Sequence, residues 1–145
     1  MKLLHIGAGN CTHEGFINLR QEDMDISQPW PYEDGSVDGV ISMQVLQQLY
    51  WRDLRVALWE SYRVLHSGGV MRFGTMLIDD NMLDYVLGWK NINLFSFDLL
   101  QRVLEQIGFR GVAVCEYRES KIKEFAQVDN RPIGRGTSYI ECYKP

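Results

Sequence analysis

Long apolar stretches are missing from this sequence of 145 residues. No run approaches the roughly 20 apolar residues that a membrane-spanning helix needs. The amino terminus also lacks a basic segment followed by a long apolar stretch and a small-residue cleavage site, which together mark secretion. With 46% hydrophobic and 23% charged residues, we expect one globular domain over residues 1–145, located in the cytoplasm and without membrane association.

Cysteine is scarce and badly placed for disulfides. Cys11, Cys115 and Cys142 are odd in number and their spacings match no disulfide framework, which agrees with a reducing compartment. Cys11 and His13 provide only two ligands, too few for a tetrahedral zinc centre. We therefore predict neither a disulfide nor a metal site.

The chain has no strong excess of positive charge. Its formal net charge is -4, and only the carboxyl-terminal part is mildly basic. Nucleic-acid binding usually leaves a stronger electrostatic footprint, so we do not expect DNA or RNA as a partner.

Short apolar runs alternate with helical patterns along the chain. One helix is predicted to start at the N-cap Ser96 and to end at Gly108, with apolar residues on one face. A second helical region, containing Leu54 and Leu65, is expected to stop at Gly68-Gly69, and a short helix is expected from residue 79 or 80 to Gly88. Strands are predicted over residues 2–6, 16–19, 37–42, 70–75, 112–117 and 138–143. This alternation predicts an α/β domain with a mostly parallel sheet, helices on both faces and an antiparallel final strand.

A glycine-rich turn, Gly7-Ala8-Gly9, follows the first predicted strand. Such a turn lets backbone N–H groups approach a ligand at the carboxyl ends of the strands, where open α/β sheets bind their ligands. A dinucleotide fingerprint would need a third glycine at position 12, which is Thr12, so an NAD site is not expected.

Taken in order, several segments resemble the class I S-adenosylmethionine (SAM) methyltransferases, especially their compact bacterial and viral branch, over nearly the whole chain. The segment Arg63-Val64-Leu65-His66-Ser67-Gly68-Gly69 is the most telling. The others are residues 4–10, 15–18, 31–38 and 108–109. The resemblance implies a Rossmann-like fold, SAM as cofactor, and a methyltransferase acting on a small or surface-exposed acceptor.

The same resemblance implies where SAM would bind. Gly7, Ala8 and Gly9 would line its methionine part, and Asp25 with the backbone of Ile26 would lie near the adenine. Ser42, at the end of the strand predicted over residues 37–42, would flank the transferable methyl group. His5 occupies the position that is usually acidic in the first strand, where it can form a hydrogen bond but offers no permanent charge.

Two further positions depart from the family pattern. Arg20 stands where an acid would bind the ribose hydroxyls, although Glu22 or Asp23 could substitute, and Gln47-Gln48 replaces the usual Glu-His pair. Glutamine cannot accept a proton, so no catalytic residue is predicted. The alternative is a non-catalytic methyltransferase-like protein that binds SAM or a partner protein.

The first crossover is short, because only six residues separate Gly9 from Phe16, whereas a parallel crossover normally needs a dozen or more. We therefore expect its helix to be shortened or absent. The apolar sheet surface left without that helix would favour a homodimer.

No motif names the methyl acceptor. The basic residues of the last long loop are expected near the pocket mouth, where they would influence acceptor choice: Arg118, Lys121, Lys123, Arg131 and Arg135.

Overall fold

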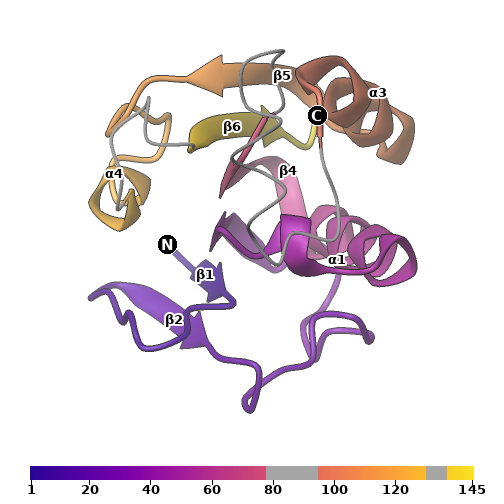
Figure 1. Cartoon of the computed structure of the whole chain (residues 1–145). Coiled ribbons are helices and arrows are strands. Elements are labelled where there is room, and N and C mark those ends of the chain that lie inside the picture. Colours follow the sequence, from indigo (N-terminus) through magenta and orange to yellow (C-terminus); the bar gives the residue numbers. More distant parts are fainter. Residues whose placement is uncertain (78–94, 130–136) are drawn as a thin grey trace.

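One six-stranded sheet organises the computed structural model, which describes residues 1–77, 95–129 and 137–145 (Figure 1). The strand order is β2-β1-β3-β4-β6-β5. Neighbours among β1 to β4 pair in parallel, whereas β6 runs antiparallel to both β4 and β5. The strands are β1 (Leu3–Ile6), β2 (Phe16–Leu19), β3 (Val37–Met43), β4 (Leu65–Thr75), β5 (Arg110–Cys115) and β6 (Ser138–Tyr143). The predicted mostly parallel α/β sheet with an antiparallel final strand is confirmed.

The connection between β1 and β2 contains no helix. The two strands pair in parallel, with Leu3 opposite Phe16 and Ile6 opposite Leu19, and residues 7–15 form only turns between them. The expected absence of the first crossover helix is therefore confirmed.

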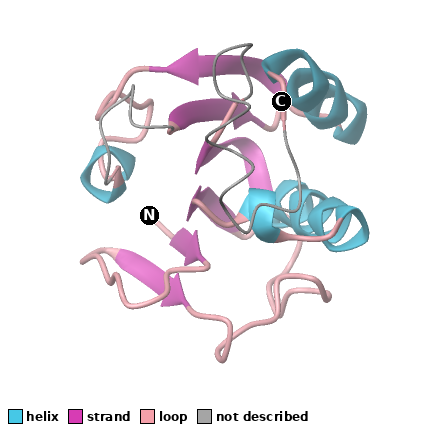
Figure 2. Ribbon diagram, in the orientation of Figure 1, coloured by secondary structure: helices cyan, strands magenta, loops and turns pink. Residues whose placement is uncertain are grey.

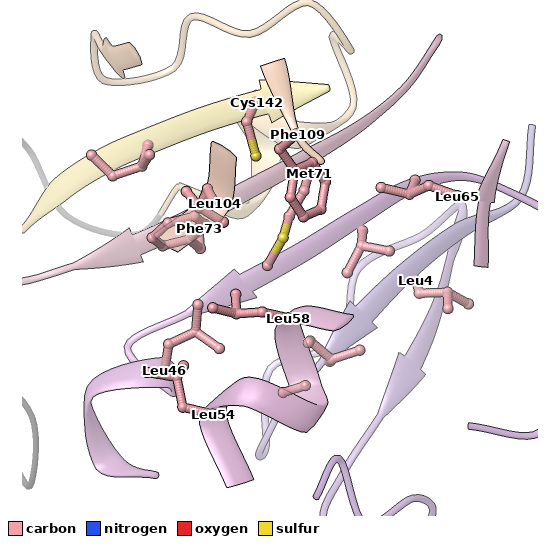
Figure 3. Close-up of a cluster of buried hydrophobic side chains, with 14 of the residues drawn as sticks. Leu4, Leu46, Leu54, Leu58, Leu65, Met71, Phe73, Leu104, Phe109 and Cys142 are labelled. Carbon is pink, nitrogen blue, oxygen red and sulfur yellow. The ribbon is translucent and has the colours of Figure 1, made fainter. Parts of the chain in front are cut away.

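Two helices, α1 (Trp51–Val64) and α3 (Phe97–Ile107), pack against one face of the sheet (Figure 2). Ser96 caps α3 as predicted, because its hydroxyl accepts a hydrogen bond from the Leu99 N–H at 3.2 Å. Figure 3 shows Leu54 and Leu58 of α1 facing the buried core that also contains Met71, Phe73 and Leu104. Burial of these apolar residues holds both helices against the sheet.

The helical region before β4 ends earlier than predicted. Helix α1 stops at Val64, and β4 starts at Leu65 and continues through Gly68 and Gly69. The pairing of β3 with β4 shifts its register here, and Gly68 takes a positive φ of 86°, which suits glycine. The expectation that Gly68-Gly69 ends a helix was wrong, because the glycines form an irregularity within a strand. The short helix predicted near residues 79–88 lies outside the described residues.

The opposite face of the sheet is covered by residues 116–129, which include the short helix α4 (Phe125–Val128). The Phe125 ring stacks on Phe16 of β2, with their centroids 6.2 Å apart. A Cβ atom on Gly39 would lie 2.6 Å from the Phe125 ring, so glycine in β3 allows this close approach. The predicted presence of helices on both faces is confirmed, although the second face carries only this short one among the described residues.

A buried ion cluster holds residues 116–129 against the sheet. Asp129 accepts hydrogen bonds from Arg72 Nε at 3.1 Å and Nη2 at 2.6 Å, and Glu141 accepts one from Arg72 Nη1 at 3.3 Å. Arg72 also donates to the backbone carbonyls of Glu116 and Glu119. Since the Arg72 and Asp129 side chains have 0% exposure, each charge depends on the other for compensation.

This covering removes the reason for expecting a dimer. The sheet surface near Leu3 and Phe16, which the missing helix would otherwise shield, packs against Phe125 and Val128 of the same chain. No observation tests the oligomeric state itself, so the homodimer stays a prediction. Within the described residues, no helix has both the length and the hydrophobicity needed to cross a membrane.

Candidate functional site

A cavity of about 500 Å³ opens at the carboxyl end of β1. Three segments form its walls: the turn after β1, the loop after β2, and the segment that runs from β3 into the first turn of α1. The lining residues are Gly7, Gly9, Gln21, Met24, Asp25, Ile26, Ser27, Val45, Gln48, Leu49 and Asp53. Its size and its mixture of apolar and polar groups suit a small organic ligand.

The glycine turn has the unusual backbone that the sequence predicted. Gly7 and Gly9 adopt φ values of 66° and 55°, in the left-handed region. A Cβ atom on Gly7 would lie 2.5 Å from Val45 Cγ2, whereas a Cβ on Gly9 would meet nothing within 4 Å. Space is therefore open beside Gly9, whereas the Val45 side chain fills the space beside Gly7. Ala8 is buried and does not line it.

Asp25 and Ile26, which the resemblance implied would lie near the adenine of SAM, both line the cavity. Their part in binding SAM stays a prediction. The Asp25 carboxylate accepts hydrogen bonds from the Ser27 hydroxyl at 2.7 Å and from the Ser27 N–H at 2.9 Å. These bonds, led by the hydroxyl, lower the pKa of Asp25 below its ordinary value. The loop thus presents an ionised carboxylate at the cavity.

His5 is buried beneath the turn and does not line the cavity. Its Nδ1 lies 3.1 Å from Asn18 Oδ1, which requires Nδ1 to carry the hydrogen because an amide oxygen only accepts. Burial lowers the pKa of His5, and this effect outweighs the hydrogen bond with Asn18, which raises it. A neutral imidazole linking β1 to β2 follows.

Ser42 is also buried outside the cavity lining, at the carboxyl-terminal end of β3. Its hydroxyl makes no hydrogen bond with the described residues. A buried polar group without a partner is uncommon and leaves a donor and an acceptor available. Four of the seven predicted binding residues line this one cavity: Gly7, Gly9, Asp25 and Ile26. The other three are buried and do not line it: His5, Ala8 and Ser42.

A chain of amide and hydroxyl groups lies beyond β3. Gln44 donates to the Thr137 hydroxyl at 2.9 Å and accepts from Gln47, which in turn accepts from the Thr75 hydroxyl at 3.2 Å. Gln44 has a positive φ of 58°, a strained conformation for a residue with a side chain. These groups lie next to the carboxyl ends of β3 and β4, where they can form hydrogen bonds but cannot take a proton.

Arg20 and its acidic neighbours do not line the cavity. Glu22 lies 3.4 Å from the Arg20 guanidinium, and Asp23 accepts a hydrogen bond from the Arg20 backbone N–H. Both acids lie outside the cavity lining, so a part for either of them in binding the ribose stays a prediction. Gln21, between Arg20 and Glu22 in the sequence, does line the cavity.

Asp53 was missed by the sequence analysis. It lies in the first turn of α1 and lines the cavity. The sequence pattern that could have indicated a binding role for Asp53 is an acidic residue in the first turn of the helix after β3. Acidic residues are common at that position because they stabilise the helix, so the pattern does not by itself predict a binding residue.

Residues 2–73 match a family model described as a methyltransferase domain. A search of the curated proteins found no match. Among solved structures, a SAM-dependent methyltransferase from Archaeoglobus fulgidus is similar over 99% of this chain and 86% of its own, with 16% identity and a TM-score of 0.71. A complex between the Haloferax volcanii Trm112 methyltransferase activator and a methyltransferase matches with 18% identity and a TM-score of 0.60.

That match covers 92% of this chain and 64% of the Haloferax volcanii chain, so this chain spans less than two thirds of it. A phosphoethanolamine N-methyltransferase from Haemonchus contortus, in complex with phosphomonomethylethanolamine and S-adenosylhomocysteine, matches over 83% of this chain and 36% of its own. Its identity is 15% and its TM-score 0.53. The predicted resemblance to class I SAM-dependent methyltransferases is thus confirmed by the domain match and by the fold.

Proposed function

We propose that this chain, which has the class I SAM-dependent methyltransferase fold, binds SAM in the cavity beside Gly7 and transfers its methyl group to a small or surface-exposed acceptor. The cavity at the carboxyl end of β1 is the observation that carries the proposal. It lies at the edge of the sheet where open α/β folds bind ligands.

The cavity residues fit the parts of SAM. Asp25 and Asp53 offer carboxylates to hydroxyl and amino hydrogens, while Ile26 and Leu49 offer apolar surface to the purine. Gly9, where a Cβ atom would meet nothing within 4 Å, leaves open space for the methionine part. The buried Ser42 hydroxyl, which lacks a partner among the described residues, remains a candidate neighbour of the methyl group.

When bound, SAM supplies a methyl group already activated on a sulfonium, so the protein mainly has to position donor and acceptor in line. The polar chain of Gln44, Gln47, Thr75 and Thr137 can orient an acceptor through hydrogen bonds. Because these groups cannot accept a proton, the acceptor they serve best is one whose lone pair is already free. Neither the fold nor the comparisons favour the non-catalytic alternative.

Calorimetry with SAM, S-adenosylhomocysteine and NAD in parallel tests the proposal. We expect heat from the first two ligands and none from NAD. The variant Asp25→Ala should weaken SAM binding about tenfold, the effect of losing one charge-assisted hydrogen bond. Glu22→Ala removes a nearby exposed carboxylate outside the cavity and is the matched control. Absence of any response to millimolar SAM would contradict the proposal.

A further inference from the structure

A second and larger cavity, of about 750 Å³, lies on the outer surface between α1 and α3, away from the glycine turn. The two helices contact each other on the same face of the sheet (Figure 2). The residues lining this groove are Trp51, Arg52, Arg55, Val56, Trp59, Val103, Gln106 and Ile107. None of them lines the cavity beside Gly7.

Two tryptophans are exposed along this groove. Trp51 is 46% exposed and Trp59 54% exposed. They lie eight residues apart with Arg55 midway, so the three side chains share one face of α1. Large exposed aromatic residues next to arginine are typical of the central contacts in protein interfaces.

Trp59 is already held in place by its neighbours. Its ring stacks on Tyr62, with centroids 6.2 Å apart, and Tyr62 packs edge-on against Phe109 with centroids 5.1 Å apart. Phe109 is fully buried. A side chain fixed in this way loses little conformational entropy when a partner binds it.

The floor of the groove is apolar. Val103 and Ile107 lie one turn apart on α3, and Val56 faces the groove from α1. All three are half-buried, so a partner could still cover part of each side chain. Two neighbouring helices with apolar side chains between them form a surface on which a third helix can pack.

The charge of the groove is positive although the protein is acidic. Arg52 and Arg55 line it, and none of the lining residues carries a carboxylate. Among the described residues Arg55 has no ion pair, and the Arg52 side chain is 90% exposed, with Asp53 no nearer than 3.8 Å. A symmetric contact between two copies would bring these arginines together, which disfavours a second copy as the occupant.

We propose that the groove between α1 and α3 binds an amphipathic helix of a partner protein that carries apolar residues on one face and carboxylates beside them. Trp51 and Trp59 anchor the apolar face, and Arg52 and Arg55 pair with the flanking carboxylates. The surface is separate from the cavity beside Gly7, so this interaction does not depend on methyl transfer.

The test uses a synthetic helical peptide of about fifteen residues, close to the length of α1, with leucines at helical spacing and glutamates beside them. A matched peptide carries lysine in place of every glutamate. Calorimetry with the whole chain should show binding of the glutamate peptide and at least about tenfold weaker binding of the lysine peptide.

Two variants locate the contact. Trp59→Ala should abolish binding of the glutamate peptide, and Arg55→Glu should weaken it about tenfold or more while improving binding of the lysine peptide. Since Arg55 is exposed, its replacement leaves the fold intact, and circular dichroism checks this for Trp59→Ala. Arg118→Glu changes an exposed arginine outside the groove and should leave binding unchanged.

Three results would overturn the proposal. The first is the absence of binding by the glutamate peptide, and the second is binding that ignores peptide charge and both groove variants. The third is competition by a thymidine oligonucleotide that requires Trp51 and Trp59, because the surface would then serve nucleic acid instead.

Discussion

Replacing Asp129 with alanine should destabilise the whole domain. The change removes both hydrogen bonds that the Arg72 guanidinium donates to this carboxylate, at 3.1 Å and 2.6 Å, as well as the one from the Arg118 N–H at 2.8 Å. Arg72 has 0% exposure and, among the described residues, would keep only the more distant Glu141 as a counter-charge. Breaking a buried ion pair by removing one partner costs about 3–5 kcal/mol.

That loss is a large share of the roughly 5–15 kcal/mol by which domains of this kind are stable. Urea denaturation followed by circular dichroism measures the free energy of unfolding. Glu22→Ala, which removes an exposed ion pair with Arg20, should change it by less than about 0.5 kcal/mol. If Asp129→Ala lost less than about 1 kcal/mol, the ion cluster would not hold residues 116–129 against the sheet as described.

Three further predictions concern other parts of the chain. Gly7→Ala should cost about 1–2 kcal/mol of stability from its positive φ, plus the clash with Val45, and the added mutation Val45→Ala should recover part of the loss. The hydrogen bond from Arg63 lowers the pKa of Glu60 below its ordinary 4.5. The ionised Glu60 therefore stabilises the fold above pH 4.5, and this stabilisation is lost as the pH falls through the folded-state pKa. The variant Glu60→Gln should reduce this dependence of the unfolding free energy on acid pH, measured by urea denaturation. Phe16→Asp should lower stability by about 3 kcal/mol, because Phe16 stacks on Phe125, and leave the mass in light scattering unchanged, whereas a halved mass would place a dimer contact at Phe16.

Local patterns predicted most of the fold. The strand over residues 138–143 and the helix capped by Ser96 were both located, because hydrophobic period and capping are local signals. The prediction that Gly68-Gly69 ends a helix was wrong. Two glycines indicate a break in regular structure, but they do not tell whether the break ends a helix or interrupts a strand.

The covering of the second sheet face could not be predicted. It depends on Arg72 meeting Asp129 and Glu141, which are 57 and 69 residues away along the chain. No local sequence pattern predicts contacts between residues so far apart. The sequence analysis therefore expected this face of the sheet to be uncovered. The basic side chains of Arg118, Lys121 and Lys123, expected near the pocket mouth, belong to this covering segment and do not line the cavity beside Gly7. Arg131 and Arg135 lie outside the described residues.

The candidate site was predictable in part. Gly7, Gly9, Asp25 and Ile26 came from the family resemblance and meet in one cavity. Asp53 reaches the same cavity because the start of α1 lies beside the carboxyl end of β1. No local pattern in the sequence predicts that arrangement.

The central claim is that SAM occupies the cavity beside Gly7, and nuclear magnetic resonance of the amide groups tests it most directly. Titration with S-adenosylhomocysteine should shift the backbone signals of the turn after β1, the loop around Asp25 and the start of α1. Signals from α4 and β5, which lie outside the cavity lining, should stay unchanged. Shifts confined to other parts of the chain, or no shifts at millimolar ligand, would contradict the claim.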